Sequence, residues 1–573
     1  MKKIIVLLLL LSLTLTALSS CDLLPPGIFD TQGDVNNDGN SDGGNTDGGN
    51  TDGGNGGGNG GGNTDGGNTD GGNTDGGNNG GGNTDGGNGG DGSCTTKTDH
   101  TDSDENGRCD TCSADVVITL DFYAVNDLHG KLFDTDKQVG VDELSTYLKS
   151  AAGRDEQYIF LSSGDMWQGS AESNITKGLI VTDWMSSLGF VSMTLGNHEY
   201  DWGSEYIKEN AEIAEFPLLA INIYDIATNK RIDYCQPSVV VDRGELKIGI
   251  IGAIGDVYSS ISSDKVTDVY FKTGSELTAL VKAESERLRA LGCDFIVYSI
   301  HDGHDRNSSS AGSISALELS AYYDTSLSRD GYVDLVFEGH THKKYVLYDN
   351  YGVYHLQNGG ENAGISHIEL DINFVTDSFK VNRGEIVSSS TYAGYASDPI
   401  VSELEEKYKD VLDGAFDTLG YNSTQRNSEF IEELVAELYY QAGVERWGDE
   451  YDIVLGGGFL RCRSPYYIYK GEVTYSDLMA VMPFDNEIVL CSIKGSDLKS
   501  KFFETSNDDY HVYYESYGAT VKGSIDPNKT YYIVVDSYTS QYKYNNLTVV
   551  EVFDKVTFAR DLLAEYIKSG GLE

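Results

Sequence analysis

Five apolar, strand-like runs, each followed at once by residues that can bind a metal ion, constrain this sequence most tightly. The runs are ITLDFYAV (118–125), YIFLSS (158–163), FVSMTL (190–195), FIVYSI (295–300) and VDLVFEG (333–339). Helical periodicity separates several of them, as in 274–291. Strand-like runs that alternate with helical stretches are typical of layered α/β domains. We therefore expect an α/β domain over about residues 116–390.

The polar residues after these runs form a set of possible ligands and catalytic groups. In chain order they are Asp127, His129, Asp165, Asn197, His198, Asp201, His301, His340 and His342. Loops that follow the carboxyl ends of strands share one edge of an α/β sheet, so we expect these side chains to converge. Core packing alone would not place Asp, Asn or His after five successive strands.

The chemistry of the ligand set indicates two metal ions rather than one. Without His198 and Asp201, the set contains seven side chains that offer oxygen or nitrogen donors and no thiolate. Seven donors are too many for one tetrahedral zinc ion and suit two divalent ions, such as zinc or manganese. Asp165 is the natural bridge, because it is the only ligand in its motif and a carboxylate has two oxygens. Two ions about 3.5–4 Å apart can bind a phosphoryl oxygen and a bridging hydroxide in line with the leaving group. The pattern therefore favours hydrolysis of phosphate esters.

The motifs DxH, GD, GNHExD, HxG and GHTH, in this order, resemble those of the calcineurin-like metallophosphoesterases. The form GNHEYD, with a C-terminal partner domain, is similar to the bacterial 5′-nucleotidase family. The resemblance implies a four-layer αββα sandwich over 115–392 and a smaller α+β substrate-binding domain over 421–573. A connector over 393–420, with a long helical pattern at 400–419, is expected to act as a hinge between them.

The resemblance also implies a role for each motif residue. One metal would be held by Asp127, His129, Asp165 and His342, and the second by Asp165, Asn197, His301 and His340. His198 and Asp201 would form the catalytic dyad, in which the carboxylate holds the tautomer of the ring and raises its pKa. Glu199, His304, His355 and His367 are expected to be structural.

The C-terminal half resembles the nucleotide-binding domain of the same family more loosely. A glycine-rich stretch at 452–461 contributes Gly457, Gly458 and Arg461, although Gly456 replaces the Asn that usually opens this motif. In YSDLMAVMPFDN (475–486), Phe484 would stack on the base and Asn486 would bond its edge. Tyr538 occupies the place of the second stacking aromatic residue, but the GGDGY-like stretch that should follow is missing. A tyrosine of the core is the alternative interpretation of Tyr538.

The N-terminus has the features of an export signal. Residues 1–20 carry two lysines, an apolar run and then small residues, and Leu18–Cys21 resembles a bacterial lipobox with Cys21 as the lipidated residue. A plain secretory peptide is the alternative. Residues 22–93, rich in Gly, Asn, Asp and Thr, have almost no apolar surface to bury and should form a disordered tether. The protein is thus expected outside the cell, with the lipid as its only membrane anchor.

A small Cys/His cluster follows over 94–114. Cys94, His100, Cys109 and Cys112 could close a structural zinc site. A disulfide between Cys109 and Cys112, or between Cys94 and Cys109, is the alternative. Neither interpretation makes the cluster catalytic.

The charge of the chain bears on its partners. Lys and Arg number 41 against 90 Asp and Glu, for a net charge of −49, which argues against binding a nucleic-acid polymer. The expected substrate is a small phosphate ester, most simply a nucleoside 5′-monophosphate. The alternatives are a 2′,3′-cyclic-nucleotide phosphodiesterase/3′-nucleotidase or another phosphomonoesterase, and a surface binding protein on a hydrolase scaffold.

Overall fold

The computed structural model describes residues 94–573 except 135–138, 154–156, 305–312, 315–322, 464, 505–509, 515–524, 544–546 and 554–556. The expected signal peptide, Cys21 and the tether lie outside the described residues. Among the helices of the described part, none is both long enough and apolar enough to cross a membrane.

The first sheet of the described chain has the strand order β15-β14-β1-β2-β3-β4. Strands β1 to β4 run parallel, whereas β14 and β15 pair antiparallel at one edge. The strands are β1 (Val117–Val125), β2 (Tyr158–Ser162), β3 (Ser192–Thr194), β4 (Leu218–Leu219), β14 (Gly364–Asn373) and β15 (Ser378–Ser388).

The second sheet has the order β10-β12-β13-β11-β9-β7-β6 among the described residues. Its parallel centre is β7, β9, β11 and β13. The strands are β6 (Ser238–Arg243), β7 (Leu246–Ile254), β9 (Phe295–His301), β10 (Ser313–Ile314), β11 (Leu335–Phe337), β12 (Lys344–Asp349) and β13 (Tyr354–Asn358). A separate ribbon joins β5 (Ile223–Asp225) to β8 (Val269–Phe271).

The two sheets pack face to face through one apolar layer. The ring of Phe122 in β1 lies 6.0 Å from that of Phe295 in β9 and 6.4 Å from that of Phe337 in β11. Strands covered on both faces read as nearly continuous apolar runs, which explains the runs in the sequence.

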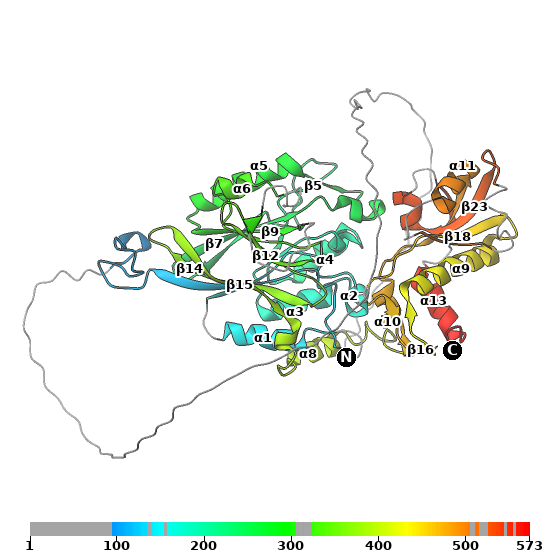
Figure 1. Cartoon of the computed structure of the whole chain (residues 1–573), viewed down its shortest axis with the longest axis horizontal. Coiled ribbons are helices and arrows are strands. Elements are labelled where there is room, and N and C mark those ends of the chain that lie inside the picture. The colour runs from blue at the N-terminus through cyan, green and yellow to red at the C-terminus, as the bar shows by residue number, and fades with distance from the viewer. Residues whose placement is uncertain are drawn as a thin grey trace, which may run out of the picture. The chain divides into compact units, whose positions relative to one another are not determined.

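Helices cover the outer faces of both sheets. Figure 1 shows α5 and α6 on one side of the sandwich and α1, α3 and α8 on the other. The helices are α1 (Asp142–Ala152), α2 (Ala171–Thr176), α3 (Leu179–Leu188), α4 (Ser204–Ile213), α5 (Gly274–Ala290), α6 (Ser326–Arg329), α7 (Ser389–Tyr392) and α8 (Pro399–Tyr408). This succession of layers confirms the αββα sandwich.

The C-terminal part is a smaller α+β unit around a sheet with the order β22-β18-β23-β21-β24 among the described residues. Long helix α9 packs on β18, and apolar clusters fill both faces of the sheet. The main elements are α9 (Ser428–Trp447), β18 (Ile453–Phe459), α10 (Tyr475–Val481), β21 (Ile488–Lys494), α11 (Gly495–Leu498), β22 (Tyr510–Tyr513), β23 (Thr530–Asp536), β24 (Thr548–Val552) and α13 (Ala559–Lys568). Two ribbons flank them: β16 (Thr418–Asn422) with β20 (Gly471–Thr474), and β17 (Arg426–Asn427) with β19 (Tyr467–Ile468).

The connector differs from its prediction. Helix α8 ends at Tyr408, and turns replace the second half of the helix expected over 400–419. Gly414 lies in the left-handed region at a φ of 81°, and the ring of Phe416 packs 6.0 Å from that of Phe133. In the turns that follow Tyr408, Leu412 is buried in the core of the sandwich, so tertiary packing accompanies the end of the helix.

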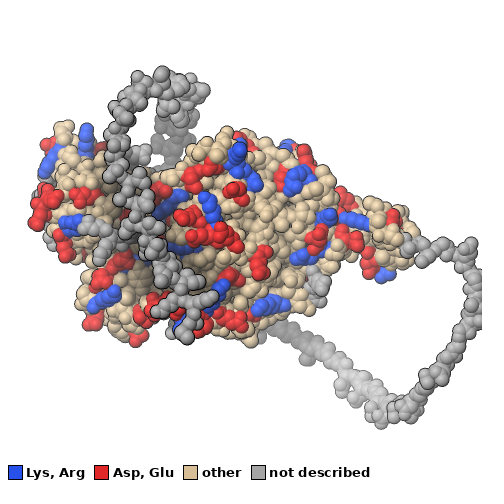
Figure 2. All heavy atoms as spheres, turned by 180° about the vertical axis from the view of Figure 1, so that it is seen from behind, with Lys and Arg blue, Asp and Glu red and all other residues tan. Residues whose placement is uncertain are grey.

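The surface charges are mixed. Figure 2 shows single basic side chains scattered among acidic ones, without a continuous basic patch on the face in view.

Candidate metal centre and substrate cavity

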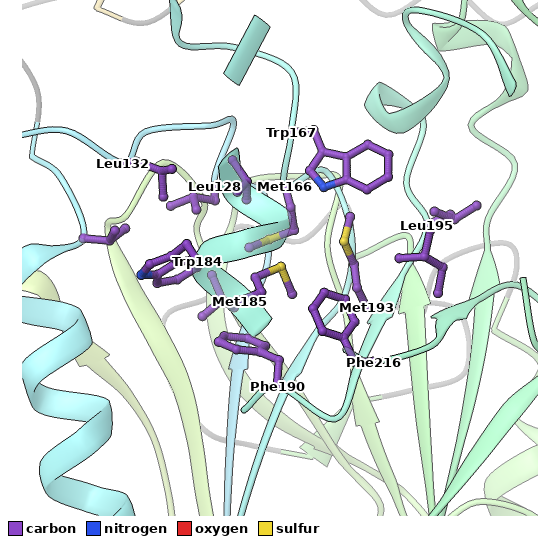
Figure 3. Packing of buried hydrophobic residues seen from close by; sticks show 14 of the residues in the cluster. Leu128, Leu132, Met166, Trp167, Trp184, Met185, Phe190, Met193, Leu195 and Phe216 are labelled. Carbon is purple, nitrogen blue, oxygen red and sulfur yellow. The ribbon is translucent and has the colours of Figure 1, made fainter. Parts of the chain in front are cut away.

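The loops that carry the predicted ligands are anchored by apolar neighbours. Leu128, Met166 and Leu195 are fully buried in the core beneath the first sheet, where Figure 3 shows them near Trp167 and Trp184. Each of these three residues lies within two positions of a predicted ligand along the chain. These apolar side chains therefore anchor their loops in the core, and the polar ligand side chains beside them lie close to one another.

The same loops carry unusual backbone conformations. Asp127, His129, Asp165, His340 and His342 all have φ between 50° and 68°. Residues other than glycine rarely adopt this region, and such strain concentrates at functional sites, where the surroundings enforce it. Five of the seven predicted ligands share it.

The first group of ligand atoms comes from Asp127, His129 and His342, which lie within 4.8 Å of one another. The Nε2 atoms of His129 and His342 are 3.1 Å apart, and His342 Nε2 lies 3.4 Å from Asp127 Oδ1. His129 Nδ1 donates to the carbonyl of Gln168 at 2.8 Å, which leaves the Nε2 lone pair for a metal. Two imidazole lone pairs and a carboxylate that converge in this way fit a divalent cation.

The second group comes from Asp165, His301 and His340. His301 Nε2 lies 3.0 Å from Asp165 Oδ2, and its Nδ1 donates to the carbonyl of Ser163 at 2.8 Å. The side-chain oxygen of Asn197 lies 2.9 Å from His340 Nδ1 and 3.2 Å from His301 Nε2. The structure thus brings all seven predicted ligands together, and the donor set fits a second cation.

The ligand residues of the two groups differ in the direction of their pKa shifts. Burial and the neighbouring histidines lower the pKa of His129 to about 3, and burial and His301 lower that of His340 to about 4. Although burial opposes it, histidine charges bring the pKa of Asp127 to about 2 and that of Asp165 well below its usual value. Ionised carboxylates and neutral imidazoles, as in His129 and His340, are the forms that bind metals. Although burial opposes it, Asp165 raises the pKa of His301 to about 10 and Asp127 raises that of His342 above its ordinary value.

Glu199 organises these loops from behind. Its carboxylate accepts hydrogen bonds from the backbone amides of Asp165, Met166, Trp167 and Gly196, at 2.7–3.2 Å. A side chain on Gly196 would not fit, since its Cβ would lie 2.2 Å from Asp165 Oδ1. The structural role expected for Glu199 is therefore a specific one, because it positions the loop of Asp165.

The two residues of the predicted dyad, His198 and Asp201, are in contact. His198 Nδ1 lies 2.7 Å from Asp201 Oδ2, within the turn that follows Asn197. Burial lowers the pKa of His198, but the carboxylates of Asp201 and Asp165 outweigh it and raise the pKa above its ordinary value. The other ring nitrogen remains available to a ligand.

A cavity of about 370 Å³ lies between the metal groups and the C-terminal unit. The sandwich contributes Asp165, Asn197, His198, Asp201, Ser259, Ser260, Ser262, Lys265, His340 and His342 to its wall. The C-terminal unit contributes the predicted Arg461, Phe484, Asn486 and Tyr538. Several lining residues escaped prediction, above all Arg463, Phe459, Lys265 and Asp536. Arg463, two positions after the predicted Arg461, could have been found from the same motif.

The loop of Phe484 is fixed on both sides. Lys177 Nζ in the sandwich lies 2.9 Å from Asp485 Oδ2, and Asn174 Nδ2 donates to the carbonyl of Pro483 at 3.1 Å. From α13, Arg560 pairs with Asp485 and donates to the carbonyl of Phe484 at 2.9 Å.

The glycine-rich stretch has a packing role. Gly457 and Gly458 lie inside strand β18 and do not line the cavity. A Cβ on Gly457 would lie 2.2 Å from the carbonyl oxygen of His511, and one on Gly458 would collide with Thr539. Tyr538 does line the cavity, with its ring 5.7 Å from that of Phe459.

The other histidines of the sandwich lie outside both groups. His304 and His355 contact the buried carboxylate of Glu338, and His367 stacks on Tyr123. Separately, Cys94, His100, Cys109 and Cys112 are close together before β1.

Comparisons with known proteins agree with this architecture. Residues 120–344 match the calcineurin-like phosphoesterase family and residues 413–522 match the 5′-nucleotidase C-terminal domain. Protein UshA of Yersinia enterocolitica is 25% identical over 484 residues, which cover 73% of this chain and 84% of that protein. A 5′-nucleotidase of Vibrio cholerae is 23% identical over 434 residues, with 67% of this chain and 75% of that protein covered.

A solved structure shows the same fold. The 5′-nucleotidase precursor from Thermus thermophilus superposes with a TM-score of 0.58 and 18% identity, over 79% of this chain and 96% of that one. Calcineurin-like phosphoesterases use divalent metals, and two groups of ligands in this chain fit them. The chain carries a calcineurin-like phosphoesterase domain followed by a 5′-nucleotidase C-terminal domain, and it is a hydrolase of the 5′-nucleotidase type.

Proposed function

We propose that this protein hydrolyses nucleoside 5′-monophosphates to a nucleoside and phosphate. The observation that carries the proposal is a cavity whose wall carries members of both metal groups, the His198–Asp201 dyad, and aromatic and basic side chains. A phosphate ester placed there has its phosphate near the ligand groups and its organic part against the C-terminal unit.

The metal ions, when bound, supply Lewis-acid polarisation of the phosphoryl group. Asp127, His129, Asp165 and His342 would hold one ion, and Asp165, Asn197, His301 and His340 the other. The protein itself supplies the proton. Asp201 fixes Nδ1 of His198, so that Nε2 donates a proton to the ribose oxygen as the bond between this oxygen and phosphorus breaks. A water oxygen forms the new bond to phosphorus, and the proton that the water loses restores protonated His198.

Charge and stacking in the cavity favour a nucleotide. Lys265, Arg461 and Arg463 add positive charge around the phosphate. Phe484 and Tyr538 offer aromatic faces to a base, and Asn486 offers an amide to its edge. The glycine pair 457–458 acts through the packing of β18.

The proposal is tested by phosphate release from AMP, 3′-AMP, cyclic 2′,3′-AMP and bis-p-nitrophenyl phosphate, with and without a chelator. We expect AMP to be preferred and the chelator to abolish turnover. Preference for cyclic 2′,3′-AMP or 3′-AMP would assign the alternative substrate class. Activity unaffected by the chelator would refute the metal-dependent mechanism, and no turnover of any ester by metal-loaded protein would favour a binding role.

We also propose that the protein is exported and anchored to the cell membrane through a lipid on Cys21. The lipobox-like Leu18–Cys21 after an apolar signal supports this. Cys21→Ser should release the protein from the membrane fraction into the medium. Equal membrane retention of wild type and variant would contradict the anchor.

A further inference from the structure

Four side chains outside the catalytic site converge before the first strand. All candidate ligand atoms of Cys94, His100, Cys109 and Cys112 lie within 4.8 Å of one another. Cys94 Sγ lies 3.5 Å from Cys109 Sγ, and Cys112 Sγ lies 3.5 Å from His100 Nδ1. The hydrolytic function uses none of them.

These distances match the edges of a tetrahedron around zinc. Bonds of about 2.3 Å to sulfur and about 2.0 Å to nitrogen place two sulfurs roughly 3.7 Å apart and a sulfur and a nitrogen roughly 3.5 Å apart. A disulfide requires sulfurs about 2.05 Å apart. The four atoms therefore surround a point between them, as ligands of one ion do.

The backbone around Cys109 is shaped to present sulfur. The amide of Thr111 donates to Cys109 Sγ at 3.4 Å, and the amide of Ser113 donates to the carbonyl of Cys109 at 2.8 Å. Ser113 adopts the left-handed region at a φ of 61°, which closes the turn.

We propose that Cys94, His100, Cys109 and Cys112 bind one structural zinc ion, which is separate from the catalytic metals. Four protein ligands leave no open position, so the site fits a structural rather than a catalytic zinc. Three thiolates and one imidazole form a ligand set typical of structural zinc, whereas the catalytic groups carry only oxygen and nitrogen donors.

The site lies at the opposite end of β1 from the catalytic groups. The cluster precedes Val117, the first residue of β1, and Asp127 follows its last residue, Val125. Nine residues of strand span about 30 Å, so the two sites are chemically independent. Figure 1 shows this N-terminal segment beside the end of β14, away from the edge that carries the ligands.

The cluster is docked on the sandwich by several contacts. The ring of His100 meets that of Phe374 edge-on at 5.8 Å, and Lys97 pairs with Asp294 and lies 5.4 Å above the same Phe374 ring. Asn373 Nδ2 donates to Asp102 Oδ2 at 2.8 Å. One ligand of the zinc thus also contacts the domain, so metal binding would lock residues 94–116 onto β14.

This docking gives the zinc site a function. The Gly-rich segment of the sequence ends at residue 93, and the cluster begins at the next residue. A zinc site directly after the Gly-rich segment would keep the start of β1 in place when force or proteases act on that segment.

The acidic loop that follows His100 includes Asp102, whose carboxylate is hydrogen-bonded within the protein. Asp102 accepts hydrogen bonds from the amides of Asn106 and Gly107 as well as from Asn373, so its two oxygens are already used by the protein. We assign no metal to this loop.

The decisive test is X-ray absorption at the zinc edge of the full-length protein, combined with metal analysis. We expect sulfur scattering at about 2.3 Å, which the catalytic groups cannot produce. Substitution of cobalt should give a sulfur-to-cobalt charge-transfer band. A Cys94–Cys109 or Cys109–Cys112 disulfide in the native protein, or zinc without sulfur ligands, would overturn the proposal.

Variants separate this site from the catalytic one. The double variant Cys109→Ser/Cys112→Ser should lose one zinc per chain and the cobalt–sulfur band, and residues 94–116 should become sensitive to proteases. Phosphate release should remain, because the change is about 30 Å from the metal groups. Cys491→Ala, a buried cysteine of the C-terminal unit, is the matched control and should keep all metals. If the double variant does not fold, the spectra of the wild type still decide.

Discussion

The ring of His198 lies over the ring of Phe484, with centroids 5.8 Å apart and planes inclined by 28°. The histidine belongs to the sandwich, and the phenylalanine belongs to the C-terminal unit. The guanidinium of Arg463 lies 5.0 Å from the centroid of the same phenylalanine ring. Phe484 therefore contacts the proposed proton donor directly, in addition to any contact with a base.

This contact gives Phe484 a double role that substrates can separate. Phe484→Ala should lower kcat/KM for AMP about 10- to 100-fold, through lost base stacking and a less ordered His198. It should also lower turnover of p-nitrophenyl phosphate, which has no base. Phe484→Tyr serves as the conservative control and should retain most activity. Unchanged turnover of p-nitrophenyl phosphate in the alanine variant would show that Phe484 acts on the base alone.

Asp201 should matter most when the leaving group is poor. Asp201→Asn removes the carboxylate 2.7 Å from His198 Nδ1, so the ring loses both its orientation and its raised pKa. We expect kcat for AMP to fall about 10²- to 10⁴-fold. The loss should be smaller for p-nitrophenyl phosphate, whose leaving group needs less protonation. An equal loss for both substrates would contradict the role as proton donor.

The two ligand groups should bind metal separately. His342→Ala alters only the first group and should remove one ion per chain, whereas Asp165→Asn should weaken both if Asp165 bridges them. Each change should lower activity by at least about 100-fold, since even residues that only support ligands cost 10- to 100-fold. Metal analysis of the purified variants checks the stoichiometry. His367→Gln, outside both groups, should keep both ions.

The connector hypothesis predicts that turnover requires the two units to move relative to each other. Helix α8 is fixed to the sandwich, with Lys149 Nζ 2.7 Å from Asp398 and Tyr408 Oη 2.5 Å from Asp183. We therefore place the hinge in the turns after Tyr408. Joining Lys177 to Asp485 by a zero-length carbodiimide cross-link should abolish turnover without releasing metal.

The variant Lys177→Ala is the matched control for this experiment. It cannot form the cross-link and should remain active after the same treatment. Full activity of wild-type protein in which the cross-link has been verified by mass spectrometry would rule out the hinge.

The buried His355 should make stability depend on pH. Burial lowers its pKa, but Asp349 and Glu338 outweigh this and raise it to about 9, above about 6.5 in the unfolded chain. A raised pKa means that protonated His355 stabilises the fold fully below about pH 6.5, and that this contribution is lost as pH rises through 9. The free energy of unfolding should fall by about 2–3 kcal/mol between pH 6.5 and pH 9.

Urea denaturation in metal-saturated buffer measures this dependence. His355→Gln should be less stable than wild type at pH 6.5 and should lose the part of the slope that His355 causes. Parallel curves for the two proteins would show that His355 does not carry the effect.

The sequence alone was enough to predict the strands, the loops that carry the candidate ligands, and a hydrolase of the 5′-nucleotidase type. These features can be predicted from short stretches of sequence. Continuous apolar runs indicate strands that are buried on both faces, and the short motif after each run contains the donor residues. It also led to the Cys/His cluster, whose spacing is local. The tertiary structure decided what depends on distant contacts. Helix α8 ends at Tyr408 and Leu412 in the following turns is buried in the core. Gly457 and Gly458 lie within β18 instead of the cavity, and the guanidinium of Arg463 lies 5.0 Å from the ring of Phe484. Such contacts depend on how elements that are distant in the sequence pack together, and the sequence around each residue does not indicate which distant residue it contacts.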